Sequence, residues 1–492
     1  MSHISSALLG STLEFLDAWR TAFPTPRLHE RIVSLGLATC LNPERKTISN
    51  AIVHSGRDQQ DWSADYKLFS RAQWDVDDLF DPLRKFWIQY YRERGWNDQP
   101  LLCAADSSHM KKTGKKIPDA AYYRDPLSPA FHTNLLWGHE CLQVSALIPV
   151  SSVAKGQCRG VPVGWKCCPR PEKPKKKNST EEMKEYESLR EKYKVPQMMV
   201  EHVEKCRQQL NALEAESRLL VMLGDGAFAN RTIFSRIPKG VAWLCRTRKD
   251  MALCYPAKRA SGKGRKPIYG ERAPTPEELR KDEGIEWKTA QVEIGGQRRE
   301  VRYKSMSGLL WDSAGARKLK ILVLAGLPYK PPGVKKKRYR QPAYLVYIGP
   351  EFPDATLIQW YIWRWEIEVN IRDEKQLLGI GEAQVWSKES VERYPAFGVA
   401  LYGTLLAAAI KANGHERKDF YLPLPKWYGK KPWHRPSMLE ILKRLRADLQ
   451  CACFWRQGKY FGGFVANGLW PRSAPKWGKP TQVSSASLAP TG

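Results

Sequence analysis

The chain has 492 residues, with 80 Lys and Arg against 51 Asp and Glu, and carries a net charge of +29. Such an excess favours a polyanionic partner, either a nucleic acid or an anionic membrane surface. Aromatic residues make up 11% of the chain and include 19 Trp, which excludes a disordered basic tail and provides for a large folded core. At this length we expect roughly two to four domains.

The sequence does not indicate a membrane protein or a disulfide-stabilised one. Its most apolar segment, residues 397–410, is shorter than the about 20 residues that span a bilayer, and the N-terminus lacks the charge order of a signal peptide. The 11 cysteines form no Cys-x-x-Cys pair, and their odd number favours free thiols in a reducing compartment. We therefore expect a cytoplasmic protein with no membrane partner.

Residues 1–95 are expected to form a helical N-terminal domain, because their apolar residues recur at helical period. The segments with this period are 11–23, 29–41, 46–55 and 74–92. Several cations make this a candidate DNA-binding domain, namely Arg27, Arg31, Arg45, Lys46 and Arg57. A generic helical packing domain is the alternative, since no turn signature specifies a DNA-binding fold.

Residues 96–249 alternate between strands and helices, which predicts a mixed α/β sheet. One buried strand, LLCAAD, ends at Asp106, and a later one, LLVMLGDG, ends at Asp225. Further strands are expected at 138–150, 159–165 and 241–246, with one long charged helix at 179–218 and a short helix at 230–236. If the strands ending at Asp106 and Asp225 are neighbours, the two carboxylates lie at the same edge of the sheet.

Residues 250–350 have the composition of a β-rich insertion. The segment 285–303 alternates like a hairpin turned at Gly295 and Gly296, and strands are expected at 319–325 and 344–348. Basic loops are present at 173–177, 258–266 and 335–340. With the overall charge of +29, we expect at least one of them to follow a DNA backbone.

The stretch YIWRWEIEVNIRDEK, at 361–375, lies in a helix expected to run from an N-cap at Asp354 to a stop at Gly379. One narrow stripe of about 60° on this helix carries Tyr361, Arg364, Glu368 and Lys375. The neighbouring stripe is apolar and would bury the helix; it consists of Trp360, Trp363, Ile367, Ile371 and Leu378. The alternative is a solvated helix with simple Arg364–Glu368 pairing.

The remaining chain is expected to be largely helical. Residues 351–412 would hold the polar-striped helix and the apolar helix at 397–410. Residues 413–492 would form a C-terminal region with a Pro- and Trp-rich basic segment, a helix at 437–449 and a flexible tail from about 472.

Three acids delivered by two strands and a helix, Asp106, Asp225 and Glu368, suit a two-metal phosphoryl-transfer site. Paired Mg²⁺ ions need carboxylate oxygens from more than one element. Arg364 and Lys375 would bind phosphates beside the metals, and Tyr361 could hydrogen-bond a phosphate oxygen.

With these residues in place, the chain resembles the bacterial insertion-sequence DDE transposases of the cut-and-paste, insertion-sequence-four-like superfamily, known by its Tyr-Arg-Glu-Lys signature. That signature, Tyr-x2-Arg-x3-Glu-x6-Lys, is matched without a gap by Tyr361, Arg364, Glu368 and Lys375. The first acid of the family matches Asp106 in AADSSHMKKTGKK, and the second matches Asp225 in LGDGAFANR. Where the family often has Thr two residues beyond the first Asp, this chain has Ser108, which keeps the hydroxyl.

The resemblance implies an α/β protein whose ribonuclease H-like mixed-sheet core is interrupted by a β-rich insertion, with a helical N-terminal domain and a helical C-terminal region. It implies two Mg²⁺ ions, with Mn²⁺ as a substitute, held by Asp106, Asp225 and Glu368. Tyr361, Arg364 and Lys375 would hold DNA phosphates. A Trp of the insertion would stack on a flipped base, for which Trp287 and Trp311 are candidates; the alternative is that both are core residues.

The activity implied is hydrolytic nicking at the ends of a mobile element, release through a DNA hairpin and strand transfer into target DNA. The partners would be double-stranded DNA, as terminal inverted repeats and as target, and a second copy of the chain in a homodimer associated with the bacterial nucleoid. Two rival functions are a nuclease of the same fold without strand transfer and a domesticated, non-catalytic DNA-binding protein.

Overall fold

The computed structural model describes residues 6–454 except for 126–127, 130, 175–178, 214, 258–266, 330–335, 337, 418–420, 424 and 426–434. The expected basic loop at 258–266 and the tail from residue 472 therefore lie outside the described residues. The same holds for most of the loop at 173–177, part of the loop at 335–340 and most of the Pro- and Trp-rich segment.

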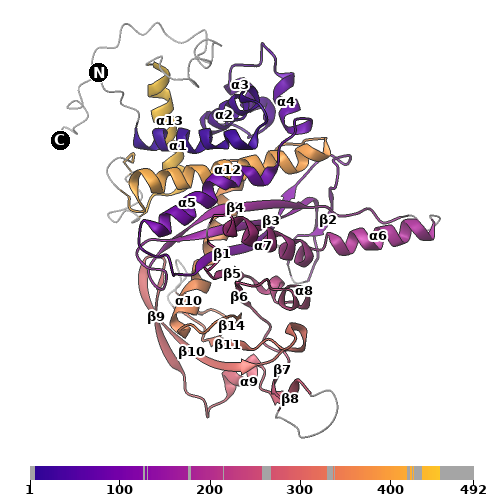
Figure 1. Ribbon diagram of the computed structural model, residues 1–492, viewed down its shortest axis with the longest axis vertical. Coiled ribbons are helices and arrows are strands. Elements are labelled where there is room, and N and C mark those ends of the chain that lie inside the picture. The colour runs from indigo at the N-terminus through magenta and orange to yellow at the C-terminus, as the bar shows by residue number, and fades with distance from the viewer. Residues whose placement is uncertain are drawn as a thin grey trace, which may run out of the picture.

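The protein is a mixed α/β molecule of elongated shape (Figure 1). Within the described residues, ten strands form one mixed sheet in the order β2-β3-β1-β5-β6-β14-β11-β10-β9, with β4 also paired to β3. These strands are β1 (Leu101–Lys111), β2 (Ala121–Arg124), β3 (Leu135–Pro149), β4 (Cys158–Cys168), β5 (Leu220–Gly224), β6 (Val241–Arg246), β9 (Lys288–Ile294), β10 (Gln297–Leu309), β11 (Leu319–Leu324) and β14 (Ala343–Ile348).

Strand β1 lies between β3 and β5 in this sheet. It runs antiparallel to β3, which in turn pairs antiparallel with β4, and it runs parallel to β5. Strand β5 is parallel to β6. The apolar runs of β1 and β5 are buried, as expected for strands with neighbours on both edges and cover on both faces.

Residues 250–350 are rich in strands, as predicted, but four of their strands continue the main sheet beyond β6. The hairpin β9–β10 turns at Gly295 and Gly296, whose φ angles of 60° and 75° give the twist that a tight hairpin needs. Strands β11 and β14 connect this hairpin to β6. Two small sheets complete the region, β7 (Leu253–Pro256) with β8 (Tyr269–Ala273) and β12 (Pro328–Tyr329) with β13 (Arg338–Tyr339).

Helices gather at one end of the molecule and on both faces of the sheet (Figure 1). They are α1 (Ala7–Asp17), α2 (Pro26–Leu41), α3 (Ile48–His54), α4 (Ser63–Ser70), α5 (Asp81–Arg92), α6 (Thr180–Lys192), α7 (Val195–Asn211), α8 (Arg231–Ser235), α9 (Pro276–Lys281), α10 (Asp354–Trp363), α11 (Trp365–Leu377), α12 (Lys388–Asn413) and α13 (Met438–Phe454). Short 3-10 helices lie at Ala18–Ala22, Val76–Phe80, Gly226–Phe228 and Asp312–Ala314.

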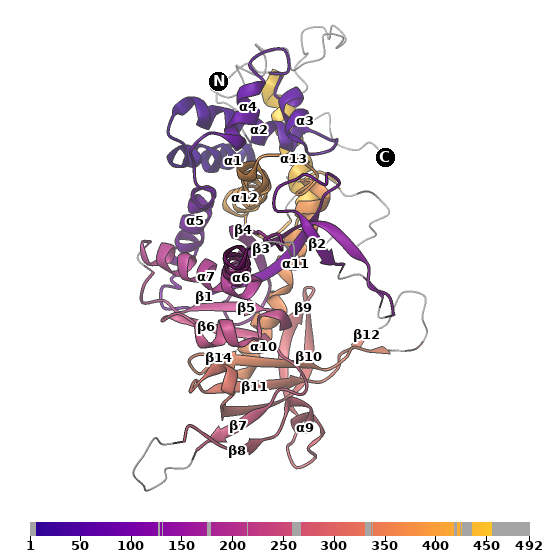
Figure 2. The same ribbon diagram turned by 90° about the vertical axis from the view of Figure 1, so that its right-hand side faces the viewer.

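Helices α7 and α11 cover opposite faces of the strands around β1 (Figure 2). A Cβ on Gly160 of β4 would meet Asn370 and Glu366 of α11, whereas one on Gly164 would meet His202 of α7. Gly160 pairs with Leu147 of β3, and Gly164 pairs with Val144. Because Leu147 and Val144 are three residues apart, the positions of Gly160 and Gly164 lie on opposite faces of the sheet. Asp106 is opposite Gln143, four residues from Leu147, and therefore faces α11.

The apolar helix expected at 397–410 is the central part of the longer α12. By length and composition α12 could cross a membrane, but 89% of its apolar window is buried inside the described part of the protein. It packs against β4 and against the N-terminal helices α1, α4 and α5 (Figure 1). The N-terminal helices thus share their core with α12, and residues from both belong to one hydrophobic cluster.

Cations that made the N-terminal helices a candidate DNA-binding domain are partly structural. Arg31 is bonded to Asp61 at 2.7 Å and to Asp65 at 3.1 Å, and Arg57 is bonded to Asp65 at 2.8 Å. Lys46 is also buried and donates to a backbone carbonyl. These three support the packing interpretation, so a DNA-binding role would depend on exposed cations such as Arg27 and Arg45. The structure also contains α4, which the sequence did not predict.

The prediction of a single long helix at 179–218 is wrong, because the structure has two helices there. Helix α6 ends at Lys192, and α7 begins at Val195 with Pro196 in its first turn. Proline lacks the amide hydrogen that would continue the preceding helix, and it is well tolerated at a helix start.

The helix expected from Asp354 to Gly379 is also divided. Helices α10 and α11 meet at Arg364, where the amide of Ile367 donates to the Arg364 carbonyl, a tighter turn than an α-helix makes. Asp354 is the first helical residue rather than the N-cap, which is Pro353. Of the expected apolar stripe, Trp360, Trp363, Ile367 and Leu378 are buried and Ile371 is partly exposed.

Candidate active site

Asp106 and Asp225 are placed side by side by the strands that carry them. Strands β1 and β5 are parallel neighbours, with Ala104 opposite Leu223. Asp106 lies two residues further along β1, which continues to Lys111 instead of ending at Asp106 as expected, and Asp225 is the first residue after β5. The two carboxylates are therefore carried by neighbouring strands, just beyond the last paired residues of β1 and β5. Asp225 also begins the 3-10 helix at Gly226–Phe228, where its side chain accepts the amide hydrogen of Ala227 at 2.9 Å.

The electrostatics of Asp106 show that the acids are close. The pKa of the Asp106 carboxyl is raised to about 7, first by burial and then by the negative charges of Asp225 and Glu368, against the opposing effects of Arg364 and of the Ser107 amide. Repulsion of this kind requires neighbouring charges within a short distance. Asp225 and Glu368 therefore each act electrostatically on Asp106.

Glu368 reaches the site from α11 but is engaged with a cation of its own helix. Arg364 Nη2 donates to Glu368 Oε1 at 2.6 Å. The Arg364–Glu368 pair that the alternative of a simple solvated helix predicted is therefore present. Arg364 also lies close enough to Asp106 to lower the pKa of the Asp106 carboxyl. The Arg364 guanidinium therefore stabilises the charged forms of two carboxylates, Glu368 through a hydrogen bond and Asp106 through its charge.

Arg364 has further capacity to bind an anion. Only 9% of the residue is exposed, and its Nε and Nη1 atoms are buried without a hydrogen-bond partner in the structure. Leaving a buried N–H unpaired costs about 1–3 kcal/mol, and more for a charged group. Tyr361 lies beside it, with the guanidinium carbon 5.6 Å from the ring centroid.

A pocket of about 430 Å³ opens next to these two residues. Its walls come from α10, the start of α11 and the strands of the insertion, and Tyr361, Arg364, Arg299 and Arg340 contribute its polar groups. The combination of an apolar floor with several cations suits a group that joins an aromatic or apolar part to an anion.

Lys375, the last signature residue, reaches the first strand of the site. Its Nζ donates to Ser108 Oγ at 2.5 Å. Ser108 lies two residues beyond Asp106 on β1 and therefore points to the same face. The cation of Lys375 and the carboxylate of Asp106 thus border one surface, on which a phosphate could be held.

Among the described side chains, no group of three or more His, Cys, Asp and Glu is arranged to hold a metal ion as it stands. Even so, the donors suit a hard divalent cation, since Asp106, Asp225 and Glu368 offer only carboxylate oxygens. Such a cation would relieve the repulsion from Asp225 and Glu368, which adds to burial in raising the pKa of Asp106.

Neither tryptophan expected to stack on a base lines the pocket beside Tyr361 and Arg364. Trp287 lies under the cations of Arg302 and Lys304, at 5.3 and 5.0 Å from its ring. Trp311 contacts Phe234 of α8 edge-on, with 5.5 Å between centroids. The pocket does include Trp365, which is 58% exposed. The exposure of Trp365 could not be predicted from the Tyr-Arg-Glu-Lys signature alone, because the break at Arg364 changes the direction of α11 relative to α10.

Two buried polar residues behind the site were missed by sequence reasoning. Glu374 is only 2% exposed, burial raises its pKa to about 8, and it accepts a hydrogen bond from Gln143 Nε2 at 2.8 Å. Gln143 lies directly opposite Asp106 in the sheet. The available signal was the position of Glu374 on the helical wheel, inside the apolar stripe between Trp363 and Ile367.

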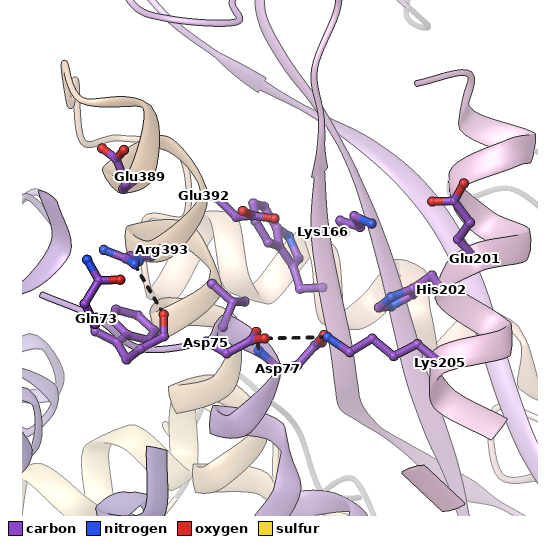
Figure 3. A pocket seen from close by; sticks show the side chains of 13 residues that line it. Gln73, Asp75, Asp77, Lys166, Glu201, His202, Lys205, Glu389, Glu392 and Arg393 are labelled. Atoms are coloured by element: carbon purple, nitrogen blue, oxygen red, sulfur yellow. Dashed lines mark hydrogen bonds and ion pairs between the residues drawn. The ribbon is translucent and has the colours of Figure 1, made fainter. Parts of the chain in front are cut away.

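A second pocket, of about 500 Å³, lies away from these residues (Figure 3). It is formed where the 3-10 helix at Val76–Phe80, β4, α7 and the start of α12 meet. Its charged lining consists of Asp75, Asp77, Glu201, Glu389, Glu392, Lys166, Lys205 and Arg393. Lys205 is paired with Asp77 and, at 3.7 Å, with Asp75.

Comparison with models of protein families gives no match for this chain, and comparison with curated proteins gives none either.

Proposed function

We propose that the protein is a Mg²⁺-dependent DNA transposase of the DDE type, with Asp106, Asp225 and Glu368 as its metal ligands. The observation that carries this proposal is that Asp225 and Glu368, which come from other elements than Asp106, lie close enough to it for their charges to add to burial in raising its pKa to about 7. The gapless match to the Tyr-Arg-Glu-Lys signature supports it independently.

The order of strands supports a ribonuclease H-like core as the finer description of the fold. Such a core has three antiparallel strands followed by two parallel ones, with acids at the ends of its first and fourth strands. Here β4, β3 and β1 are antiparallel neighbours, and β5 and β6 follow parallel to β1. The strands between β6 and Glu368 then represent the insertion, joined to the edge of the core by the pairing of β14 with β6.

The residues of this chain would divide the work of phosphoryl transfer. Asp106, Asp225 and Glu368 would hold the divalent ions, which supply an activated water and stabilise the leaving oxygen. Lys375, held by Ser108, would bind a phosphate oxygen beside Asp106. The free N–H groups of Arg364 would bind the next phosphate, and the pocket with Tyr361 and Trp365 would take the terminal nucleotide.

The charge of the chain supports the substrate class. With a net charge of +29, the protein binds a polyanion in preference to a neutral ligand. We propose double-stranded DNA as that polyanion, recognised at paired element ends by a homodimer, in the cytoplasm of a bacterial cell.

A cleavage and joining assay tests the proposal. The full chain is incubated with Mg²⁺ and a DNA fragment carrying the sequences that flank its gene, and with the same ends already cut together with a supercoiled plasmid. Transposase function predicts nicks at defined ends and insertion of the pre-cut ends into the plasmid.

The rivals give different results in the same assay. A nuclease of this fold cuts the DNA but does not join pre-cut ends. A non-catalytic DNA-binding protein shifts the fragment in a gel without cutting it in Mg²⁺ or Mn²⁺. Either result would overturn the transposase proposal.

A further inference from the structure

The acid at position 366 joins three parts of the molecule that are distant in sequence. Glu366 lies in the first turn of α11, and its side chain is 11% exposed. One carboxylate oxygen accepts from Arg435 Nη2 at 2.7 Å, and the other accepts the backbone N–H of Gly160 on β4 at 3.3 Å. Glu366 thus links the catalytic helix to the sheet and to the chain just before α13.

Residues 435 and 436 form reciprocal hydrogen bonds with the start of β4. Arg435 Nη1 donates to the carbonyl of Cys158 at 2.8 Å, and Arg159 Nη2 donates to the carbonyl of Pro436 at 2.6 Å. The two guanidinium groups lie close enough to lower the pKa of Arg159 through their repulsion, after the larger effect of burial. Glu366 is the counter-charge between them, so removing it would leave two cations unbalanced in a buried place.

Close packing fixes the position of α11 along β4 at this point. A Cβ on Gly160 would lie 2.7 Å from Asn370 Oδ1 and 3.0 Å from Glu366 Cβ, so only glycine allows this approach. Asn370 Nδ2 donates to the Gly160 carbonyl at 3.0 Å, one turn after Glu366. Glu366 and Asn370 therefore bind the N–H and the carbonyl of Gly160, and these two hydrogen bonds set the position of α11 along β4.

The same segment leads into a helix that is attached to the N-terminal part of the molecule. Arg446 of α13 donates to the carbonyl of Cys40 at 2.7 Å, at the end of α2. Helix α13 also packs against α1 and α12 (Figure 1). A continuous set of contacts thus runs from the N-terminal helices through α13 and Arg435 to α11.

We propose that Arg435 is a positioning residue and that the C-terminal segment sets the placement of the catalytic helix through its ion pair with Glu366. Glu368 is two residues from Glu366 on the same helix and points to the other side, toward Asp106. A shift of α11 along β4 therefore moves Glu368 relative to the two strand acids. The consequence for cleavage rests on the proposed function, whereas the placement of α11 does not.

Amide hydrogen exchange of the intact protein tests the placement directly. Arg435→Gln is expected to raise exchange in residues 365–377 at least about tenfold, because the ion pair no longer closes the contact between α11 and β4. Arg417→Gln is the control: Arg417 lies in the same C-terminal region and pairs at 2.7 Å with Glu440 of α13 rather than with an acid of α11. It is expected to leave exchange in 365–377 unchanged.

A second variant keeps the test decisive if Arg435→Gln fails to fold. Glu366→Gln removes the charge, while its amide oxygen can still accept the Gly160 N–H, and it is expected to raise exchange in the same segment. Arg435→Lys should restore part of the protection. Equal exchange in residues 365–377 for Arg435→Gln and Arg417→Gln would overturn the proposal, and so would an increase spread evenly over the whole chain.

DNA cleavage provides the functional half of the experiment. Arg435→Gln is expected to cut element ends at least about tenfold more slowly, with the affinity for end DNA unchanged within about twofold. If the wild-type chain does not cut DNA at all, the transposase function fails and the exchange result still decides the role of Arg435. If exchange rises but cleavage is unchanged, the positional control of Glu368 is wrong.

Discussion

Two aspartates in different regions of this protein are both largely buried, and their ionisation is shifted in opposite directions. At the edge of the sheet, burial and the charges of Asp225 and Glu368 raise the pKa of Asp106 to about 7. In the second pocket, burial acts to raise the pKa of Asp77, but the hydrogen bond from Lys205 and nearby cations outweigh it and bring the pKa below its usual value (Figure 3).

The difference lies in what surrounds each carboxylate. In the second pocket Asp77 is paired with Lys205, which also lies 3.7 Å from Asp75. Where β1 and β5 adjoin, Asp225 and Glu368 both repel Asp106, Arg364 acts on Asp106 and Glu368, and the Nε and Nη1 atoms of Arg364 have no hydrogen-bond partner among the described residues. Charges that a fold leaves unbalanced mark a place where a ligand completes the structure, and unbalanced sites of this kind are often functional.

The largest expected effect comes from removing an acid at the sheet edge. Asp106→Asn, Asp225→Asn and Glu368→Gln should each lower Mg²⁺-dependent strand cleavage at least about 10³-fold, because one member of a cooperating set is lost. Binding of end DNA, measured by gel shift, should stay within about threefold. A variant that still cuts at the wild-type rate would remove that acid from the site.

A smaller effect is expected at the cation that faces Asp106. Lys375→Gln should slow cleavage and weaken end binding by about 10- to 100-fold, since a charge-assisted hydrogen bond contributes about 1.5–3 kcal/mol. Arg372→Gln is the control, because Arg372 lies on the same helix, is exposed and pairs with its neighbour Asp373. Equal losses in both variants would mean that general positive charge, rather than the place of Lys375, is what matters.

A third effect should appear in stability and depend on pH. The pKa of Asp106 is raised from 3.8 to about 7, so the folded protein holds a proton that the unfolded chain releases, and stability falls as the pH rises between these values. Asp106→Asn should therefore have a higher Tm than wild type at pH 8 by a few degrees and nearly the same Tm at pH 4.

Magnesium gives the matching control for that measurement. At pH 8, millimolar Mg²⁺ should raise the Tm of the wild type and not that of Asp106→Asn, because the ion relieves a repulsion that the variant lacks. An identical response of the two proteins, at both pH values, would show that Asp106 has an ordinary environment.

The smallest effect is expected in the second pocket. Asp77→Asn removes an ion pair whose lysine is half exposed and still has Asp75 at 3.7 Å, so the loss of stability should stay within about 1 kcal/mol. Cleavage should be unchanged. A large loss of cleavage in Asp77→Asn would remove the contrast between the two regions and assign the second pocket a part in the reaction.

Local sequence patterns predicted the elements that carry the acids. The apolar runs before Asp106 and Asp225 define β1 and β5, and the hairpin at Gly295 and Gly296 forms as its alternation and turn residues indicate. These features depend on neighbours in sequence, where strand periodicity and turn chemistry are informative. The parallel pairing of β1 with β5 is a long-range contact, and it brings Asp106 and Asp225 close together.

Other features depended on contacts that no local pattern encodes. The helix break at Arg364 accompanies two buried indoles that donate to a distant loop, Trp360 to Val153 and Trp363 to Gly156. Glu374 meets Gln143 across 231 positions of sequence, and Glu366 meets Arg435 across 69. Periodicity could assign these acids to a helix face, but the partners that make them buried structural groups come from tertiary packing.

The convergence of Asp106, Asp225 and Glu368 on shared divalent ions can be tested without knowing the DNA sequence. Fe²⁺ is allowed to replace Mg²⁺ in the intact protein, and ascorbate with peroxide then produces hydroxyl radicals that cut the polypeptide next to the bound ion. We predict cuts near all three of residues 106, 225 and 368, suppressed together by excess Mg²⁺ and lost together in Asp225→Asn. Cuts near only one of these residues, or in the second pocket around residue 77, would contradict a shared metal site.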